Sequence, residues 1–196
     1  MKQQLTTYYP TFINTLFNLS SWQRKLCTTT SAALLLGLAA NISIPTYPVP
    51  FSLQSLGVLL IGACLGRKLG ALAILQYLFL GALGLPMFAN GSGGFMALVS
   101  PSAGYLYGYA FSAYIAGFAA EKGYDRRFLL GLIAFACAHQ LIFVFGVTYL
   151  MGYFHISLTE ALQVGYLPFV GVDALKFIIA TCVMFSLWRY HAKKHQ

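Results

Sequence analysis

The sequence predicts an all-α integral membrane protein, a bundle of six transmembrane helices with a Gly-rich, non-helical loop between spans three and four. Its composition indicates the class, because 59% of the 196 residues are hydrophobic and only 8% are charged, against roughly 25% in soluble domains. The charge pattern agrees, because basic pairs stand at the ends of long apolar runs. The predicted divisions are an interfacial segment (1–25), a membrane domain (26–190) and a basic cytoplasmic tail (191–196).

The first 25 residues are expected to lie on the membrane surface. Phe12, Leu16 and Leu19 recur at helical spacing among polar residues, without the continuous apolar core of a signal peptide. Span one follows as the uncharged run 26–44. Its nineteen residues would measure about 28 Å as a helix, enough to cross the hydrocarbon core.

Small residues recur at four-residue spacing along span one, at Thr29, Ala33 and Gly37. Such a stripe lets another helix approach closely. We expect it to be a partner interface, either with a membrane coupling protein or in self-association. The alternative is packing within the chain's own bundle, the commoner use of such stripes.

Three prolines between residues 44 and 54 forbid a regular helix and hold the backbone extended. Ser52 and Gln54 then open span two, which ends at Gly66, and span three covers Leu69–Leu85. The start of span two offers unpaired N–H groups and the positive end of the helix dipole, so it is a candidate site for a carboxylate. The alternative is an ordinary external turn.

The segment 86–104 is too apolar for a solvated loop and too rich in Gly and Pro for a helix. Non-helical backbone of this polarity is tolerated where it is buried in protein or lines a cavity. We therefore expect it to fold over or into the bundle, with Asn90 able to donate and accept hydrogen bonds. A plain flexible hairpin is the alternative. The candidate gating residues are Gly91, Ser92, Gly93 and Gly94.

Three more spans are predicted at 103–120, 128–151 and 168–188, with an outside loop at 152–167. Six spans place eleven of the twelve Lys and Arg residues on the cytoplasmic side, which agrees with the positive-inside rule. We therefore expect a multi-pass protein of the cell inner membrane, in contact with lipid and with both termini in the cytoplasm.

Asp173 and Lys176 are the exception to this charge pattern, because they lie inside the last apolar run. Their spacing of three places them on one face of a helix. A charge at this depth costs about 2.5–3.5 kcal/mol on insertion scales, so the pair needs a polar cavity, a mutual contact or a ligand. We interpret it as a solute site rather than a structural ion pair.

Several other functions are disfavoured by the pattern. The basic residues do not line one face, so nucleic acid is not an expected partner. The four cysteines are scattered and show no metal-binding spacing, so we expect no metal and no disulfide framework. No phosphate-binding loop is present, so any energy from ATP must come from another protein. Ser92 and His139 could suggest a serine hydrolase, but Ser92 lacks the strand-to-helix context of a nucleophile elbow, and no enzyme activity is expected.

Four segments together resemble the BioY family, the substrate-binding S components of energy-coupling factor (ECF) transporters for biotin. They are VPFSLQSLGVLLIGACLG (Val49–Gly66), GALGLPMFANGSGG (Gly81–Gly94), PSAGYLYGY (Pro101–Tyr109) and PFVGVDALK (Pro168–Lys176). The resemblance covers about residues 26–188. It implies a six-helix bundle that binds biotin near its outer side, with no cofactor, and that works with a membrane coupling protein and two ATPase subunits.

The resemblance also implies roles for single residues. Asp173, Lys176 and Asn90 match family positions that line the binding pocket, and Gln54 and Tyr105 match positions near it. The chain departs from the family pattern at 171–172, where Gly-Val replaces Pro-Gly, and at 100–104, where Ser-Pro-Ser-Ala-Gly replaces Gly-Pro-Thr-Gly-Gly. These departures bear on the shape of the pocket.

The chemistry of biotin fits the same residues. Asp173 can accept from the ureido N–H groups and Asn90 can satisfy the ureido carbonyl. Either Lys176 or the helix end after Pro50 can meet the carboxylate. Two alternatives stay open at this point: an S component or small carrier for another vitamin or carboxylate, and a non-transport membrane protein with a structural ion pair.

Overall fold

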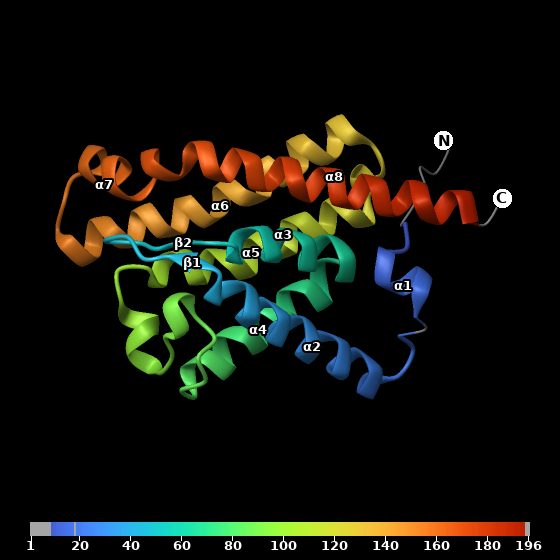
Figure 1. The fold of residues 1–196 in the computed structure, drawn as a ribbon, viewed down its shortest axis with the longest axis horizontal. Coiled ribbons are helices and arrows are strands. Elements are labelled where there is room, and N and C mark those ends of the chain that lie inside the picture. The colour runs from blue at the N-terminus through green and yellow to red at the C-terminus, as the bar shows by residue number, and fades with distance from the viewer. Residues whose placement is uncertain (1–8, 18, 195–196) are drawn as a thin grey trace, which may run out of the picture.

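The structure, a computed structural model, describes residues 9–17 and 19–194 and is largely helical (Figure 1). In the described part, two short helices, α1 (Phe12–Leu16) and α7 (Leu158–Gly165), lie at opposite ends of the long axis. The body consists of six helices of twelve or more residues: α2 (Trp22–Asn41), α3 (Gln54–Leu65), α4 (Arg67–Ala82), α5 (Ala103–Glu121), α6 (Phe128–Phe154) and α8 (Val170–Lys194).

Short extended and 3₁₀ segments connect these helices. Two strands, β1 (Ser43–Ile44) and β2 (Phe51–Ser52), pair antiparallel, and the three prolines fall in the segment from 45 to 50 that joins them. The expectation that no helix runs through these prolines is therefore confirmed, and the backbone is extended at the two strands that flank them. The 3₁₀ turns are η1 (Ala89–Gly91), η2 (Phe95–Val99), η3 (Tyr124–Arg126) and η4 (Leu167–Phe169).

The helices differ in how well they satisfy the requirements for crossing a membrane. Within the described residues, two stretches are long and apolar enough, Phe128–Phe154 and Leu158–Lys193, while Gln54–Leu65 is apolar but shorter. Length and composition therefore identify two candidate spans, although long helices occupy all six predicted positions. Large apolar side chains are nevertheless exposed along the outer faces of several helices, with Leu38 at 68% and Leu129 at 69%. Exposed apolar surface on this scale is typical of a lipid-facing protein.

Two element boundaries differ from the sequence prediction. Helix α2 begins at Trp22 rather than at residue 26, because Ser21 caps it by accepting a hydrogen bond from the Arg24 amide at 3.3 Å. The predicted outside loop 152–167 contains α7, whose start is fixed by a capping box between Ser157 and Glu160. The Ser157 side chain accepts from the Glu160 amide, while the Glu160 carboxylate accepts from the Ser157 amide at 2.9 Å.

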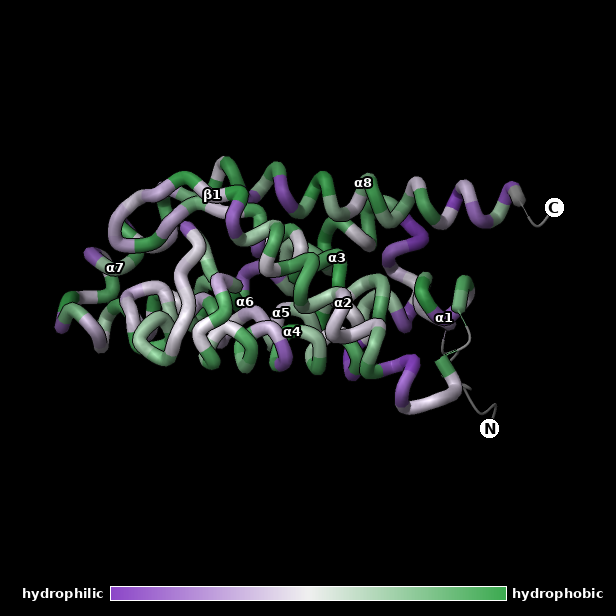
Figure 2. Tube along the Cα trace, turned by 60° about the horizontal axis from the view of Figure 1, so that its bottom comes forward, coloured by the Kyte–Doolittle hydropathy of each residue, from purple (hydrophilic) through white to green (hydrophobic). Residues whose placement is uncertain are grey.

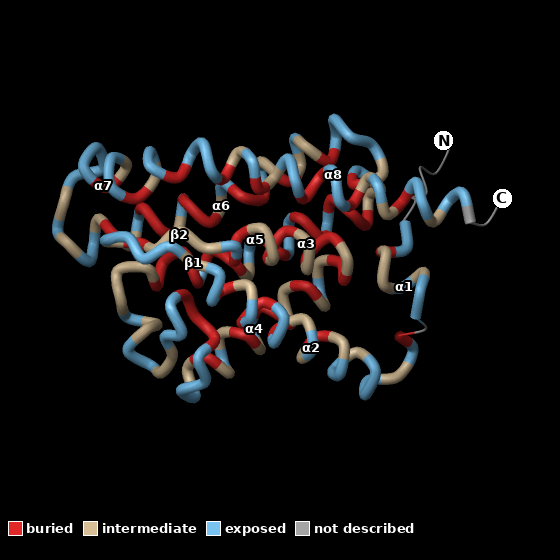
Figure 3. Tube along the Cα trace, in the orientation of Figure 1, coloured by how far each residue is buried: buried red, intermediate tan, exposed pale blue. Residues whose placement is uncertain are grey.

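Helix α5 lies at the centre of the bundle and contacts α3, α4 and α6. Its small residues permit this close packing: a Cβ added to Gly108 would lie 2.8 Å from the Cα of Ile142 on α6. A Cβ on Gly62 of α3 would likewise lie 2.4 Å from the Ala113 carbonyl oxygen. Figure 3 shows the buried residues facing one another between the helices. The centre of the bundle is thus rigidly packed around α5.

The stripe on α2 faces inward, contrary to the expected partner interface. Thr29 and Ala33 are fully buried, and Gly37 is buried so closely that an added Cβ would lie 2.8 Å from the Met87 sulfur. The stripe therefore packs inside the chain's own bundle, and the prediction that it contacts a partner is wrong for this conformation. The outward face of α2 instead carries the exposed side chains Leu34, Leu35 and Leu38.

The N-terminal segment packs against the end of the bundle where α8 also ends (Figure 1). The Arg126 guanidinium lies over the Tyr9 ring at 4.7 Å and over the Trp188 ring at 3.9 Å, and it donates a hydrogen bond to the Pro10 carbonyl. Phe12 adds an edge-on contact with Trp188. Polar residues gather at this end in Figure 2, where the hydrophilic colour is strongest. Residues 1–8 of the predicted interfacial segment and 195–196 of the basic tail lie outside the described residues.

Candidate functional site

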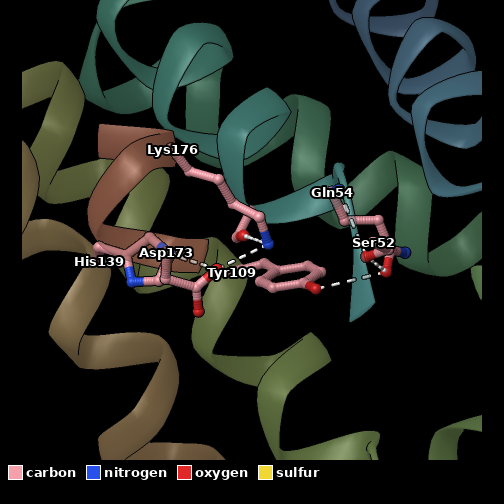
Figure 4. A network of polar contacts seen from close by, with 7 residues as sticks. Ser52, Gln54, Tyr109, His139, Asp173 and Lys176 are labelled. Carbon is pink, nitrogen blue, oxygen red and sulfur yellow. Dashed lines mark hydrogen bonds and ion pairs between the residues drawn. The ribbon is translucent and has the colours of Figure 1, made fainter. Parts of the chain in front are cut away.

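Asp173 and Lys176 meet on the inward face of α8, as their spacing predicts. The Lys176 Nζ lies 2.6 Å from Asp173 Oδ1, and the two residues are only 6% and 5% exposed. Lys176 also donates a hydrogen bond of 3.1 Å to the Ser55 hydroxyl on α3, which couples α8 to α3 (Figure 4). These two contacts use two of the three ammonium N–H donors, so a third remains available for a ligand.

Gln54 stands at the start of α3 in a second, uncharged group of polar side chains (Figure 4). Its amide nitrogen donates to the Tyr77 hydroxyl, and its Oε1 accepts from Ser52 at 2.8 Å and from Tyr109 at 3.4 Å. Gln54 is buried, so its amide is held by these partners. This group forms one wall of the site, next to the ion pair.

The site consists of two adjoining cavities. The smaller measures about 30 Å³ and has Asp173, Lys176 and Ser55 in its wall, so it has room for a water-sized group. The larger measures about 210 Å³ and is lined by neutral polar residues, among them Gln54 and Asn90. The residues that line both cavities are Val49, Pro50, Tyr105 and Tyr109. The two tyrosines on α5 therefore form part of the partition between the cavities.

Each predicted binding residue has a defined place in this arrangement. Asp173 and Lys176 lie in the small cavity, Gln54 and Asn90 in the large one, and Tyr105 borders both. The Tyr105 hydroxyl donates to the Gly165 carbonyl at 2.7 Å, which ties α5 to the end of α7. The five residues thus gather at one end of the bundle, but Asn90 is not placed against the ion pair.

The loop that carries Asn90 packs against its neighbours. Asn90 adopts a left-handed backbone conformation (φ 59°), and its Oδ1 accepts a hydrogen bond of 2.9 Å from Ser43 on β1. The Gly94 amide donates to the Gly81 carbonyl at 2.7 Å, and a Cβ on Gly93 would lie 2.2 Å from the Leu85 carbonyl oxygen. The loop therefore closes the large cavity against β1 and the end of α4, while its role as a gate stays a prediction.

Aromatic side chains cover the small cavity. The rings of Phe51 on β2 and Phe169 on η4 lie 4.3 Å apart, and Phe143 on α6 contacts Phe169 at 6.1 Å. Phe143 and Phe169 both line the small cavity. The hairpin and the start of α8 thus meet through aromatic rings beside the ion pair.

His139 was not among the predicted site residues. It lies on α6, lines the small cavity, and its Nε2 is 3.8 Å from Asp173 Oδ1. The sequence signal was a histidine inside a long apolar run, but the run alone does not reveal that α8 packs against this position. Ser92 lies in the other cavity and donates to the Ala89 carbonyl, so the two residues do not form a nucleophile–base pair.

A hollow of about 700 Å³ lies apart from this site, between α5 and α6. It is bordered by tyrosines, Thr148 and apolar residues, with no charged side chain. The described residues contain no cluster of His, Cys, Asp or Glu that could hold a metal ion.

Comparison with known proteins gives a consistent result. The sequence profile of the BioY family matches residues 9–193. The biotin transporter BioY of Thermotoga maritima is 39% identical over 82% of this chain and 93% of its own length. That of Rhizobium etli is 36% identical over 74% of this chain and 81% of its own. A crystal structure of the S component for biotin from an ECF-type ABC transporter superimposes with a TM-score of 0.76, at 25% identity, over 85% of this chain and 92% of that one.

Proposed function

This chain belongs to the BioY family, and we propose that it is the biotin-binding S component of an ECF transporter in the cell inner membrane. It is a membrane protein that transports its ligand and is not an enzyme. Biotin is the substrate, and no cofactor takes part. In the structure, the proposal rests on the buried ion pair of Asp173 and Lys176, which lies in the wall of a small cavity.

The ion pair matches one edge of a cyclic urea. Biotin's ureido ring presents N–H donors beside a C=O acceptor, while the pair presents a carboxylate acceptor beside an ammonium donor, 2.6 Å apart. Asp173 therefore accepts from a ureido N–H, and Lys176 donates its third N–H to the ureido oxygen. The carboxylate belongs to the opposite end of biotin, so Lys176 does not serve both ends.

The rest of the ligand extends into the larger cavity. The small cavity, about 30 Å³, has room for no more than the polar edge of the ureido ring, so the rest of the ligand needs the space bounded by Gln54, Asn90 and Tyr105. The amide groups of Gln54 and Asn90 offer both donors and acceptors there. Biotin that bridges the two cavities requires Tyr105 and Tyr109 to move apart from their positions in this structure.

The finer parts of the proposal concern the membrane and the partners. Six long helices provide six spans, with the end that holds α1 and the end of α8 facing the cytoplasm and α7 facing outside. A membrane coupling protein and two ATPase subunits supply the energy; the likeness to an S component of an ECF-type ABC transporter supports this part of the proposal. The buried stripe on α2 leaves the coupling contact to other, exposed surfaces.

Binding of biotin to the detergent-purified chain tests the proposal. Biotin should raise the unfolding temperature in proportion to the logarithm of its concentration once it exceeds the dissociation constant, because a ligand that binds only the folded state stabilises it by mass action. A vitamin of similar size without a ureido ring, such as thiamine, is the control. If biotin and thiamine leave the unfolding temperature equally unchanged at millimolar concentration, the proposed function is wrong.

A further inference from the structure

His139 is a buried polar residue that its own protein does not satisfy. Its side chain is 1% exposed, and within the described residues neither ring nitrogen has a hydrogen-bond partner. The Asp173 oxygen at 3.8 Å is too far for a hydrogen bond. Buried polar groups without partners are rare in folded proteins and cost stability, so each one calls for an explanation.

The surroundings of His139 offer no structural explanation for it. Its ring lies against the rings of Phe143 at 5.5 Å and Phe177 at 6.2 Å, an environment that a phenylalanine would suit as well. Its polar atoms are instead close to the small cavity that Asp173 and Lys176 line. The imidazole is therefore placed for a partner inside the cavity.

We propose that His139 is a substrate-contacting residue, one of whose ring nitrogens forms a hydrogen bond with the biotin that occupies this site. The ion pair meets one N–H and the oxygen of the ureido ring, so polar atoms of the ligand remain for a further partner. His139 supplies that partner, because it lines the same cavity and neither of its ring nitrogens is hydrogen-bonded within the described residues. This inference rests on the proposed function, since it assigns one more contact to the same ligand.

The proposal predicts that replacing His139 by phenylalanine weakens biotin binding without lowering the stability of the ligand-free protein. In His139→Phe the ring keeps its aromatic contacts but loses both nitrogens, so one polar atom of the bound biotin is buried without a hydrogen-bond partner. Such a loss should weaken biotin binding by roughly fivefold to a hundredfold. Without ligand, the same change removes two unpartnered nitrogens from the interior, so the unfolding temperature should stay equal or rise by roughly 2–4 °C.

The experiment measures biotin affinity by isothermal titration calorimetry, and ligand-free unfolding temperature, for four purified proteins. They are the wild type, His139→Phe, His139→Gln and Gln140→Leu. His139→Gln keeps an acceptor within reach and should bind biotin within a few-fold of wild type. Gln140 is the next residue on α6 and is exposed, so Gln140→Leu is the matched control and should change neither measurement.

The possible outcomes distinguish a ligand contact from a packing role of His139. Weaker binding by His139→Phe at equal or higher unfolding temperature, with recovery in His139→Gln, supports the contact. Wild-type affinity in His139→Phe overturns it. A lower ligand-free unfolding temperature with lost binding in both His139 variants assigns the residue to packing and also overturns it. Absence of biotin binding by the wild type would instead contradict the proposed function itself.

Discussion

At the scale of single residues, the buried ion pair links the proposed binding role to stability, because each charge is stabilised by the other. Lys176 has Asp173 and the Ser55 hydroxyl as its partners, at 2.6 and 3.1 Å. Removing one charge from such a pair leaves the other in a medium of low polarity, whereas removing both costs little if apolar residues fill the space. Single and double substitutions therefore distinguish a ligand site from a structural pair.

Asp173→Asn should weaken biotin binding by roughly tenfold to a hundredfold, because a charge-assisted hydrogen bond worth about 1.5–3 kcal/mol is lost. The stranded Lys176 should also lower the unfolding temperature. The double substitution Asp173→Leu with Lys176→Met should restore stability without restoring binding. Titration calorimetry and thermal unfolding of the three proteins check this, and a double variant with wild-type affinity would refute the assignment of the site.

Asp125, at the opposite end of the molecule from α7, is another buried acid, only 2% exposed. Burial raises the pKa of its carboxyl from 3.8 to about 6, although the hydrogen bond from Trp188 at 2.6 Å and the charge of Arg126 act to lower it. The folded state therefore holds a proton that the unfolded state has released between pH 4 and 6. The contribution of this carboxyl to the free energy of unfolding is therefore largest below pH 4, and it falls as the pH rises to about 6.

Asp125→Asn should remove this pH dependence, because asparagine still accepts from Trp188 but does not ionise. The wild type should lose up to about 3 kcal/mol of unfolding free energy between pH 4 and 6 relative to the variant, at about 1.4 kcal/mol for each unit of pKa. Thermal unfolding of both proteins between pH 4 and 8 measures the difference. Parallel curves across this range would show that the carboxyl is not buried in the folded protein.

At the scale of elements, the loop after α4 closes the larger cavity through a few hydrogen bonds. Asn90 is held by Ser43 on β1, and Gly94 by the Gly81 carbonyl. The contact between Asn90 and Ser43 lies at the protein surface, where opening costs little compared with the packed helices. The tip of the loop at 90–92 can therefore open while Phe88 stays packed against Tyr77 and Gly81 on α4.

Biotin should slow amide hydrogen exchange in residues 88–94 by holding the loop closed over the occupied cavity. The segment 124–126 in η3, at the other end of the bundle, provides the internal control and should exchange equally with and without ligand. Hydrogen exchange measured by mass spectrometry, on peptides that cover both segments with and without biotin, tests this prediction. Unchanged exchange in the loop at saturating biotin would leave it without a gating role.

At the scale of the whole molecule, the two ends differ in charge. The end formed by α1, the α3–α4 junction, η3 and the end of α8 contains most of the basic residues, while the end formed by α7 contains Glu160. Arg67 at the first of these ends pairs with Glu121 at 3.0 Å. Retention of Lys and Arg in the cytoplasm predicts which end faces inward.

Cysteine labelling in intact cells should confirm this orientation. In a variant whose four native cysteines are replaced, Glu160→Cys should react with a membrane-impermeant maleimide from outside. Tyr124→Cys, at an exposed position of η3, should react only after the cells are opened. Labelling of Tyr124→Cys in intact cells would contradict the proposed topology.

The sequence predicts features that depend on neighbours along the chain better than those that depend on distant ones. The Asp173–Lys176 contact follows from a spacing of three residues on one helix, and the extended segment before α3 follows from its prolines. The closeness of His139 to Asp173 depends on how α6 packs against α8, which local spacing does not contain. The small-residue stripe on α2 does allow close packing, but the prediction that a partner covers it is wrong, because the sequence does not specify whether a partner or α4 and Met87 lie against it.

The stacking of Arg126 between Tyr9 and Trp188 has a consequence for biogenesis. Tyr9 is synthesised well before Trp188, so the cluster that Arg126 forms with the two rings cannot be complete until every helix between them has been synthesised. The ion pair on α8 is subject to the same delay, since Ser55 on α3 must wait for Lys176. The proposed binding site is therefore unfinished when α3 enters the membrane, and it can bind its ligand only after α8 has docked.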